Sequence, residues 1–237
     1  MRKLRDQLKH MFRWFTLRIR GGPLVGMKWI AWCSKRMLNG NYEPAKTAAI
    51  LESVLPGQTT YDIGGHVGYY AILQSKIVGA EGHVFCFEPR PLNIEYLKRH
   101  IKINSINNVT LVESAVSDKQ GQARFEDSVG TGTGYLSDRG SLSVRTTRID
   151  SLIEKEGYPI PDFIKLDVEG GEIAAIHGAE NTIVQHRPRM LIATHGDREH
   201  QFVLDFLNRH QYEIQILNPS ATKGDTEILA RPLRRAG

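Results

Sequence analysis

The chain has 237 residues, of which 41% are hydrophobic and 24% are charged. These proportions are ordinary for a soluble globular protein, and the length suits one substantial α/β domain with an appendage. Runs of about eighteen apolar residues, which would indicate a membrane-spanning helix, do not occur in the sequence. Two cysteines are too few for a disulfide framework or a cysteine metal site, and we expect a cytoplasmic protein.

The net charge of +5 is unevenly distributed along the chain. Residues 1–40 carry ten Lys/Arg and one Asp, whereas residues 41–237 carry 21 Lys/Arg and 25 Asp/Glu. The body is therefore mildly acidic and offers no basic stripe, so a nucleic-acid partner fits poorly. The composition leaves the oligomeric state open.

Residues 1–20 predict a basic amphipathic helix that ends at Gly21-Gly22-Pro23. Such a helix can lie on an anionic membrane, which would make the protein peripheral to it. Alternatively, the helix caps the domain and its charges are solvated. Further helices are predicted over residues 24–38 and 42–55. We therefore divide the chain into a helical N-terminal extension (1–56) and a main domain (57–237).

From residue 57 onward, predicted strands and helices alternate, which favours an α/β fold with a doubly wound, mostly parallel sheet. The last strand is predicted to pair antiparallel with its neighbour. Two further strands form a hairpin insertion around a glycine-rich loop at 128–135, which we interpret as a substrate lid. Asp150 is expected to cap helix 151–156. The predicted strands are 59–63, 83–88, 109–116, 123–125, 143–147, 163–168, 189–195, 212–218 and 227–231, and the predicted helices are 67–78, 91–104, 151–156, 171–185 and 199–210.

The stretch Asp62-Ile63-Gly64-Gly65-His66-Val67-Gly68 predicts a strand that ends in a glycine turn before a helix. Glycine allows a sharp turn there and a close approach of the backbone to a ligand. The spacing differs from the dinucleotide-binding G-x-G-x-x-G, because His66 stands where that pattern needs glycine. A carboxylate at Asp62 suits a cationic, phosphate-free ligand such as S-adenosyl-L-methionine better than a pyrophosphate. Taken alone, the pattern also fits an ordinary strand–helix turn.

A second carboxylate, Glu88, ends the predicted strand 83–88. It follows Gly68 by about twenty residues, the spacing at which an acidic side chain can bind ribose hydroxyls. Pro89 stops the strand, so Glu88 is expected at the carboxyl end, where open α/β sheets bind ligands. Together with the glycine turn, Glu88 favours a nucleoside site.

Acidic residues and a histidine follow two later strands. Asp167 ends the fourth strand of the alternating series, at the same edge as Asp62 and Glu88. Glu169 and Glu172 share a face of the next turn, although helix capping also explains acids there, Glu172 above all. His195 ends the fifth strand and lies near Asp167 if the two strands are neighbours. It is either structural or catalytic.

Four motifs together resemble the FkbM family of S-adenosyl-L-methionine-dependent methyltransferases, over roughly residues 58–216. The family usually reads D-x-G-A-N-x-G where this chain has Gly65 and His66, so the role of His66 is open. The resemblance implies a class I Rossmann-like fold and O-methylation, often of sugar hydroxyls in glycolipids, polysaccharides or natural products. The motifs are Asp62–Tyr70, Phe87–Asn93, Ser114–Asp118 and Ile164–Gly170.

The resemblance also implies roles for individual residues. Asp62 and the turn with Gly64, Gly65, His66 and Gly68 would hold the methionine part of the cofactor. Glu88 would bind the ribose, Ser114 and Ala115 would flank the adenine, and Asp167 would lie beside the sulfonium and the acceptor. S-adenosyl-L-homocysteine would be the product.

Transfer of the methyl group to a hydroxyl would be a direct displacement in which positioning contributes much of the rate. A hydroxyl is a poor nucleophile, so a base should accept its proton, with His195 favoured over Asp167 and Asp167 over Glu169. A divalent ion held by these three residues is a less favoured alternative, and we expect no metal.

Two other classes of function remain as alternatives. A non-catalytic nucleoside-binding scaffold attached to a membrane is the first, and the intact Asp167-Val168-Glu169 segment argues against it. A nicotinamide dehydrogenase fits poorly because of the glycine spacing. The partner is therefore expected to be a small-molecule or glycan acceptor.

Overall fold

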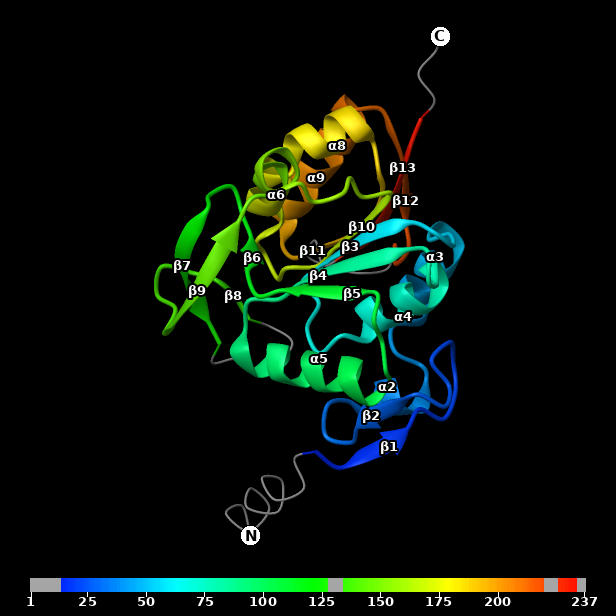
Figure 1. Cartoon of the computed structure of the whole chain (residues 1–237). Helices are drawn as coiled ribbons and strands as arrows, with labels where there is room; N and C mark the ends of the chain where they lie inside the picture. Colours follow the sequence, from blue (N-terminus) through cyan, green and yellow to red (C-terminus); the bar gives the residue numbers. More distant parts are fainter. Residues whose placement is uncertain (1–13, 128–133, 220–225, 234–237) are drawn as a thin grey trace.

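A computed structural model describes residues 14–127, 134–219 and 226–233. A seven-stranded sheet forms its centre (Figure 1). All neighbouring strands in it are parallel except those that pair with β13, which lies antiparallel between β11 and β12. The strand order is β12 (Tyr212–Ile216), β13 (Thr226–Pro232), β11 (Arg189–Thr194), β10 (Phe163–Leu166), β3 (Thr59–Ile63), β4 (His83–Phe87) and β5 (Val109–Val112). This confirms the predicted α/β class and the antiparallel last strand.

Helices cover both faces of this sheet (Figure 1). One face carries α3 (Pro44–Ser53), α4 (Tyr69–Val78) and α5 (Pro91–Ile103), and the other carries α6 (Ile149–Glu156), α7 (Glu172–Gly178), α8 (Glu180–His186) and α9 (Asp197–Arg209). Each face has its own cluster of buried apolar side chains, because successive residues of a strand point to opposite faces. Phe163 belongs to the first cluster and Ile164 to the second. Burial on both faces explains why these strands are almost continuously apolar.

The insertion forms a separate four-stranded sheet, on the left in Figure 1. Its order is β6 (Ala115–Val116), β9 (Leu142–Thr147), β7 (Gly121–Glu126) and β8 (Tyr135–Leu136). The antiparallel β7–β9 pair confirms the predicted hairpin. The single strand predicted over 109–116 is wrong, because the chain turns where Ser114 N donates to Val112 O and residues 115–116 pair in the smaller sheet. Residues 128–133 of the predicted lid lie outside the described residues.

The N-terminal helices were predicted wrongly where the structure describes them. Residues 16–18 and 28–30 form the antiparallel strands β1 (Thr16–Arg18) and β2 (Lys28–Ile30), and α2 spans only Lys35–Asn39. Gly22 and Gly26 have positive φ and turn the chain between the strands. Trp29 is fully buried and stacks on His100 of α5, with ring centroids 3.7 Å apart. Burial of this large ring stabilises the short strand β2, although the spacing of the apolar residues favours a helix.

Residues 1–13 of the predicted basic helix lie outside the described residues, so membrane contact stays a prediction. Among the residues that the structure describes, every helix is too short or too polar to cross a bilayer. Helix 42–55 is confirmed as α3, and its side chains pack into the same apolar cluster as α4. The division of the chain at residue 56 stays a prediction.

Two smaller predictions in the second half were also wrong. Helix 171–185 is interrupted at Ala179, which ends α7 and begins α8. Asp150 lies inside α6 and accepts hydrogen bonds from the backbone N–H groups of Asn181 and Thr182. It therefore caps the next-but-one helix, α8, across a tertiary contact, which local sequence spacing cannot reveal.

Candidate active site

A cavity of about 260 Å³ opens at the carboxyl ends of the parallel strands. This edge is where open α/β sheets bind ligands. Asp62 and Gly68, which were predicted to bind the cofactor, do not line the cavity. The predicted residues that line it are Gly64, Gly65, His66, Glu88, Ser114, Ala115, Asp167, Glu169 and His195.

The glycine turn between β3 and α4 is fixed by backbone geometry. Gly64 has φ +81°, and a Cβ there would overlap the carbonyl oxygen of Asp167. A Cβ on Gly65 would collide with the sulfur of Cys86. Gly68 has φ +95°, begins α4 and packs against Leu97. The first two glycines thus bring the turn against neighbouring strands, whereas Gly68 serves helix packing.

Glu88 leads out of β4 and is almost fully buried, at 4% exposure. Its carboxylate accepts hydrogen bonds from the backbone N–H groups of His66 (2.7 Å) and Arg90 (2.9 Å) and from the Asn93 amide (3.2 Å). Burial raises the pKa of Glu88 to about 7, although these hydrogen bonds oppose the shift. The side chain is therefore held rigidly at the cavity wall.

His66 adopts the left-handed region at φ +49°, which is uncommon for a residue other than glycine. Its Nε2 is buried and has no hydrogen-bond partner among the described residues. Burial lowers the pKa of His66 to about 4, so the ring is neutral near pH 7. A neutral ring beside the cavity can hydrogen-bond a ligand without adding charge.

Asp62 is fully buried and acts on the cavity only indirectly. Its Oδ1 lies 3.1 Å from Nζ of Lys165, which also donates to the carbonyl oxygen of Gly64 at 2.7 Å. Burial alone would lower the pKa of Lys165, but Asp62 and Asp167 raise it above its usual value. The ion pair therefore fixes the glycine turn to β10 through the hydrogen bond from Lys165 to Gly64.

Asp167 follows β10 and is held by Lys46 of α3. The Lys46 Nζ lies 2.9 Å from Asp167, 3.0 Å from Glu43 and 3.2 Å from Glu227. Burial alone would raise the pKa of Asp167, but the cations of Lys46, Lys165 and His195 hold it well below its usual range. Asp167 is thus ionised and is a weak base.

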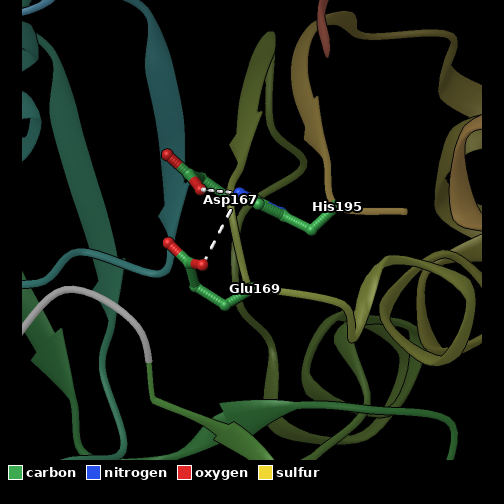
Figure 2. A group of neighbouring side chains, drawn as sticks. All are labelled: Asp167, Glu169 and His195. Atoms are coloured by element: carbon green, nitrogen blue, oxygen red, sulfur yellow. Dashed lines mark ion pairs between the residues drawn. The ribbon is translucent and has the colours of Figure 1, made fainter. Parts of the chain in front are cut away.

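His195 follows β11, which pairs with β10, and so it reaches Asp167 as predicted. Figure 2 shows the side chains of His195, Asp167 and Glu169 directed toward one another. Nε2 of His195 lies 3.8 Å from Asp167 Oδ1 and 3.7 Å from Glu169 Oε2. Nδ1 lies 2.9 Å from Oε1 of the fully buried Glu172.

The charge state of His195 follows from these neighbours. Burial alone would lower its pKa, but the hydrogen bond to Glu172 and the charges of Asp167 and Glu169 raise it to about 9. Because a carboxylate oxygen accepts hydrogen bonds, Nδ1 of His195 is the donor, and the lone pair of the neutral ring is on Nε2. Nε2 therefore points into the acidic cluster that lines the cavity.

Comparison with known proteins identifies the family. Residues 62–214 match the Methyltransferase FkbM domain, which is more than half of the chain. The chain belongs to the FkbM methyltransferase family. The matched region contains the glycine turn, Glu88, Asp167 and His195. It excludes α3 and β13.

Two curated relatives align with this FkbM domain. Hexuronic acid methyltransferase AglP of Haloferax volcanii is 29% identical over 136 residues, which cover 56% of this chain and 55% of the relative. The 2-O-methyltransferase NoeI of Sinorhizobium fredii is 27% identical over 166 residues, which cover 61% of this chain and 65% of the relative. The matches thus span between about half and two thirds of each relative.

A solved structure shows the same fold. The FkbM methyltransferase from Methylobacillus flagellatus superposes with a TM-score of 0.52 at 19% identity, over 78% of this chain and 50% of the other. Likeness at this level of identity establishes the Rossmann-like fold alone.

The acidic cluster of the FkbM domain also has the composition of a metal site. Single ligand atoms of Asp167, Glu169 and His195 all lie within 4.8 Å of one another. Two carboxylates and an imidazole suit a divalent cation. The ammonium of Lys46, bonded to Asp167, competes for the same carboxylate.

Several residues of this site were not predicted from the sequence. Lys165 carried a signal, since a lysine inside a buried strand needs an acidic partner. Lys46, Glu43 and Glu227 carried none, because they are distant in sequence and belong to ordinary polar positions of α3 and β13. Glu172 was explained as a helix-capping residue, whereas its carboxylate bonds His195.

Proposed function

We propose that this protein transfers a methyl group from S-adenosyl-L-methionine to a hydroxyl group of a sugar, with release of S-adenosyl-L-homocysteine. The observation that carries the proposal is a single cavity lined by the Gly64–His66 turn, Glu88, Asp167 and the His195 ring. A nucleoside-binding half and a proton-accepting group thus face the same space.

The residues present fit a cationic nucleoside. Glu88 ends β4 at the position from which a carboxylate can bind ribose hydroxyls. One buried polar atom of a cavity-lining residue, His66 Nε2, has no hydrogen-bond partner among the described residues and can bond a ligand. When bound, S-adenosyl-L-methionine supplies a methyl group on a positively charged sulfur. The ionised Asp167 stabilises positive charge in this cavity.

His195 is the proposed base. Its Nε2 can accept the hydroxyl proton, while Glu172 holds the ring by Nδ1 and stabilises the imidazolium that results. Asp167 is a poorer base because Lys46 lowers its pKa. Glu169 is a better base than Asp167, since burial raises its pKa.

A sugar as the acceptor is supported by the relatives. One of them is named for hexuronic acid and the other for 2-O-methylation. Both names point to methylation of oxygen-rich molecules. The same residues leave two alternatives, which are a scaffold that binds the cofactor without catalysis and a divalent ion at Asp167, Glu169 and His195.

One assay separates these readings. The protein is incubated with tritiated methyl donor and with crude glycolipid and polysaccharide fractions. Label in a sugar-containing product that alkali does not release supports O-methylation. Binding of S-adenosyl-L-homocysteine in calorimetry without any labelled product would favour the scaffold. Loss of activity in EDTA, with recovery on adding Mg²⁺ or Mn²⁺, would favour the metal.

A further inference from the structure

Two segments outside the family-matched region reach the cavity. Tyr42, Glu43 and Lys46 come from the start of α3, and Asn218 and Glu227 come from the loop and strand around β13. The family match covers only residues 62–214. This part of the cavity wall therefore lies outside the family-matched region.

The strand order separates this wall from the cofactor residues. Along the edge of the sheet, Glu88 follows β4, the glycine turn follows β3, Asp167 follows β10 and His195 follows β11. β13 is next, and because it is antiparallel its first residue, Thr226, pairs with Thr194 at the end of β11. The reacting groups thus lie between a cofactor half and a second half at β13.

Lys46 ties the second half together. Its ammonium bonds Glu43, Asp167 and Glu227, and its side chain is only 5% exposed. Tyr70 donates a hydrogen bond to Glu43 at 2.6 Å, and Asn218 accepts one from the backbone N–H of Glu227 at 2.7 Å. α3 and β13 are therefore held rigidly against the catalytic residues.

The half of the cavity at α3 and β13 carries accessible negative charge. The side chains of Glu43, Glu169 and Glu227 are 32%, 30% and 18% exposed, so their oxygens remain accessible. Among the described residues, each Lys or Arg that lines the cavity, and His195 when protonated, is already paired with a carboxylate: Lys46, Lys165, Arg90 and His195. Carboxylates accept hydrogen bonds from hydroxyls, but a further anion beside them is repelled.

We infer that the methyl acceptor binds between α3 and β13, against Tyr42, Glu43, Asn218 and Glu227, and that this subsite selects neutral sugars over sugars that carry a carboxylate. The inference rests on the proposed methyl transfer and adds the acceptor class to it. It separates this chain from the relative named for hexuronic acid.

The test uses matched acceptors that differ only at C6. A panel of p-nitrophenyl hexosides and the corresponding hexuronides is incubated with the full-length protein and tritiated methyl donor. We expect kcat/KM to be at least about tenfold higher for the best hexoside than for its hexuronide, since about 1.4 kcal/mol of charge repulsion gives a factor of ten. Calorimetry with both sugars, in the presence of S-adenosyl-L-homocysteine, measures the same preference as binding.

Variants of Glu43 and Glu227 test whether the acceptor binds at this subsite. In the double variant Glu43→Gln, Glu227→Gln, Lys46 keeps Asp167 and loses two carboxylate partners. Its ammonium can then pair with a hexuronide, and we expect the preference to shrink by about tenfold or to reverse. The control is Glu213→Gln on β12, whose side chain is exposed outside the cavity and should leave the preference unchanged.

Three outcomes contradict the inference. Equal or faster methylation of hexuronides by the unaltered protein overturns it and leaves the proposed methyl transfer in place. An unchanged preference in the double variant, with unfolding temperature retained, shows that the acceptor binds elsewhere. Bound S-adenosyl-L-homocysteine with no methylation of any sugar overturns the proposed function and this inference with it.

Discussion

The two halves of the cavity are held together in different ways. In the half that we propose to bind the cofactor, Glu88 is held by backbone N–H groups of His66 and Arg90. Gly64 and Gly65 there both donate to the carbonyl of Phe87. In the half that we propose to be catalytic and to bind the acceptor, ion pairs join Lys46 of α3 to Asp167 and Glu227. The first half depends on backbone geometry and short sequence motifs, whereas the second depends on charges brought together from distant elements.

The largest expected effect is on catalysis in the second half. Changing His195→Ala should lower kcat by at least about a hundredfold, because a positioned base contributes about 10²–10⁴ to the rate. Affinity for S-adenosyl-L-homocysteine should change little. The matched control is His177→Ala, since His177 is about half exposed on α7. Equal loss in both variants, or a weakened cofactor in His195→Ala, would contradict the assignment of His195 to the acceptor half.

Removing Lys46 should disrupt the ion pairs of the second half. Lys46→Met leaves three carboxylates without their shared cation, and breaking a buried pair costs about 3–5 kcal/mol. Urea unfolding at pH 7 measures the free energy of unfolding, with the exposed Lys119→Met as the control. If both variants unfold at the same urea concentration, the ion pairs do not hold this half together.

Glu88→Ala tests the first half. We expect about ten- to a hundredfold weaker binding of S-adenosyl-L-homocysteine in calorimetry, since hydrogen bonds to a charged group contribute about 1.5–3 kcal/mol. Glu81→Ala, at an exposed position before β4, is the control. Should Glu88→Ala bind the nucleoside as tightly as the unaltered protein, the cofactor would lie elsewhere.

The last expected effect concerns pH. Only neutral His195 accepts a proton, and its pKa is raised to about 9, so kcat/KM should increase about tenfold per pH unit up to about pH 9. Glu172→Gln removes a hydrogen-bonded charge that raises this pKa. The break in the profile, which is the pH at which kcat/KM stops increasing, should therefore move to lower pH. Glu156→Gln, exposed at the end of α6, should leave the break in place. A flat profile in the unaltered protein would exclude His195 as the base.

The same pKa has a consequence for stability with a definite sign. Because the folded pKa of His195 lies above its usual value, protonated His195 stabilises the fold fully below about pH 6.5. That contribution is lost as the pH rises through about 9. Comparing the urea midpoints of the unaltered protein and His195→Ala across this window measures the loss.

The sequence predicted the first half because its signals are local. A glycine turn after an apolar strand and an acid at the end of the next strand fix Gly64 and Glu88 by chain geometry. The neighbouring positions of β10 and β11 then brought His195 to Asp167. Lys46 and Glu227 could not be found in this way, because 180 intervening residues separate them and only the strand order brings them together.

Tertiary burial explains most of the errors in the fold. Trp29 fits a helical stripe in sequence, yet its stacking on His100 places it in a short strand. Asp150 accepts a hydrogen bond from a backbone N–H group in the first turn of a helix that begins thirty residues later. In both cases a contact with another element overrides the local pattern.

The position of β13 has a consequence for synthesis on the ribosome. This strand pairs with β11 on one side and with β12 on the other, and it contributes Glu227 to the cavity. Neither β11 nor β12 can pair with β13 before residues 226–232 have left the exit tunnel. A nascent chain that already contains the whole family-matched region therefore still lacks Glu227 and the pairing partner of β11 until those residues emerge.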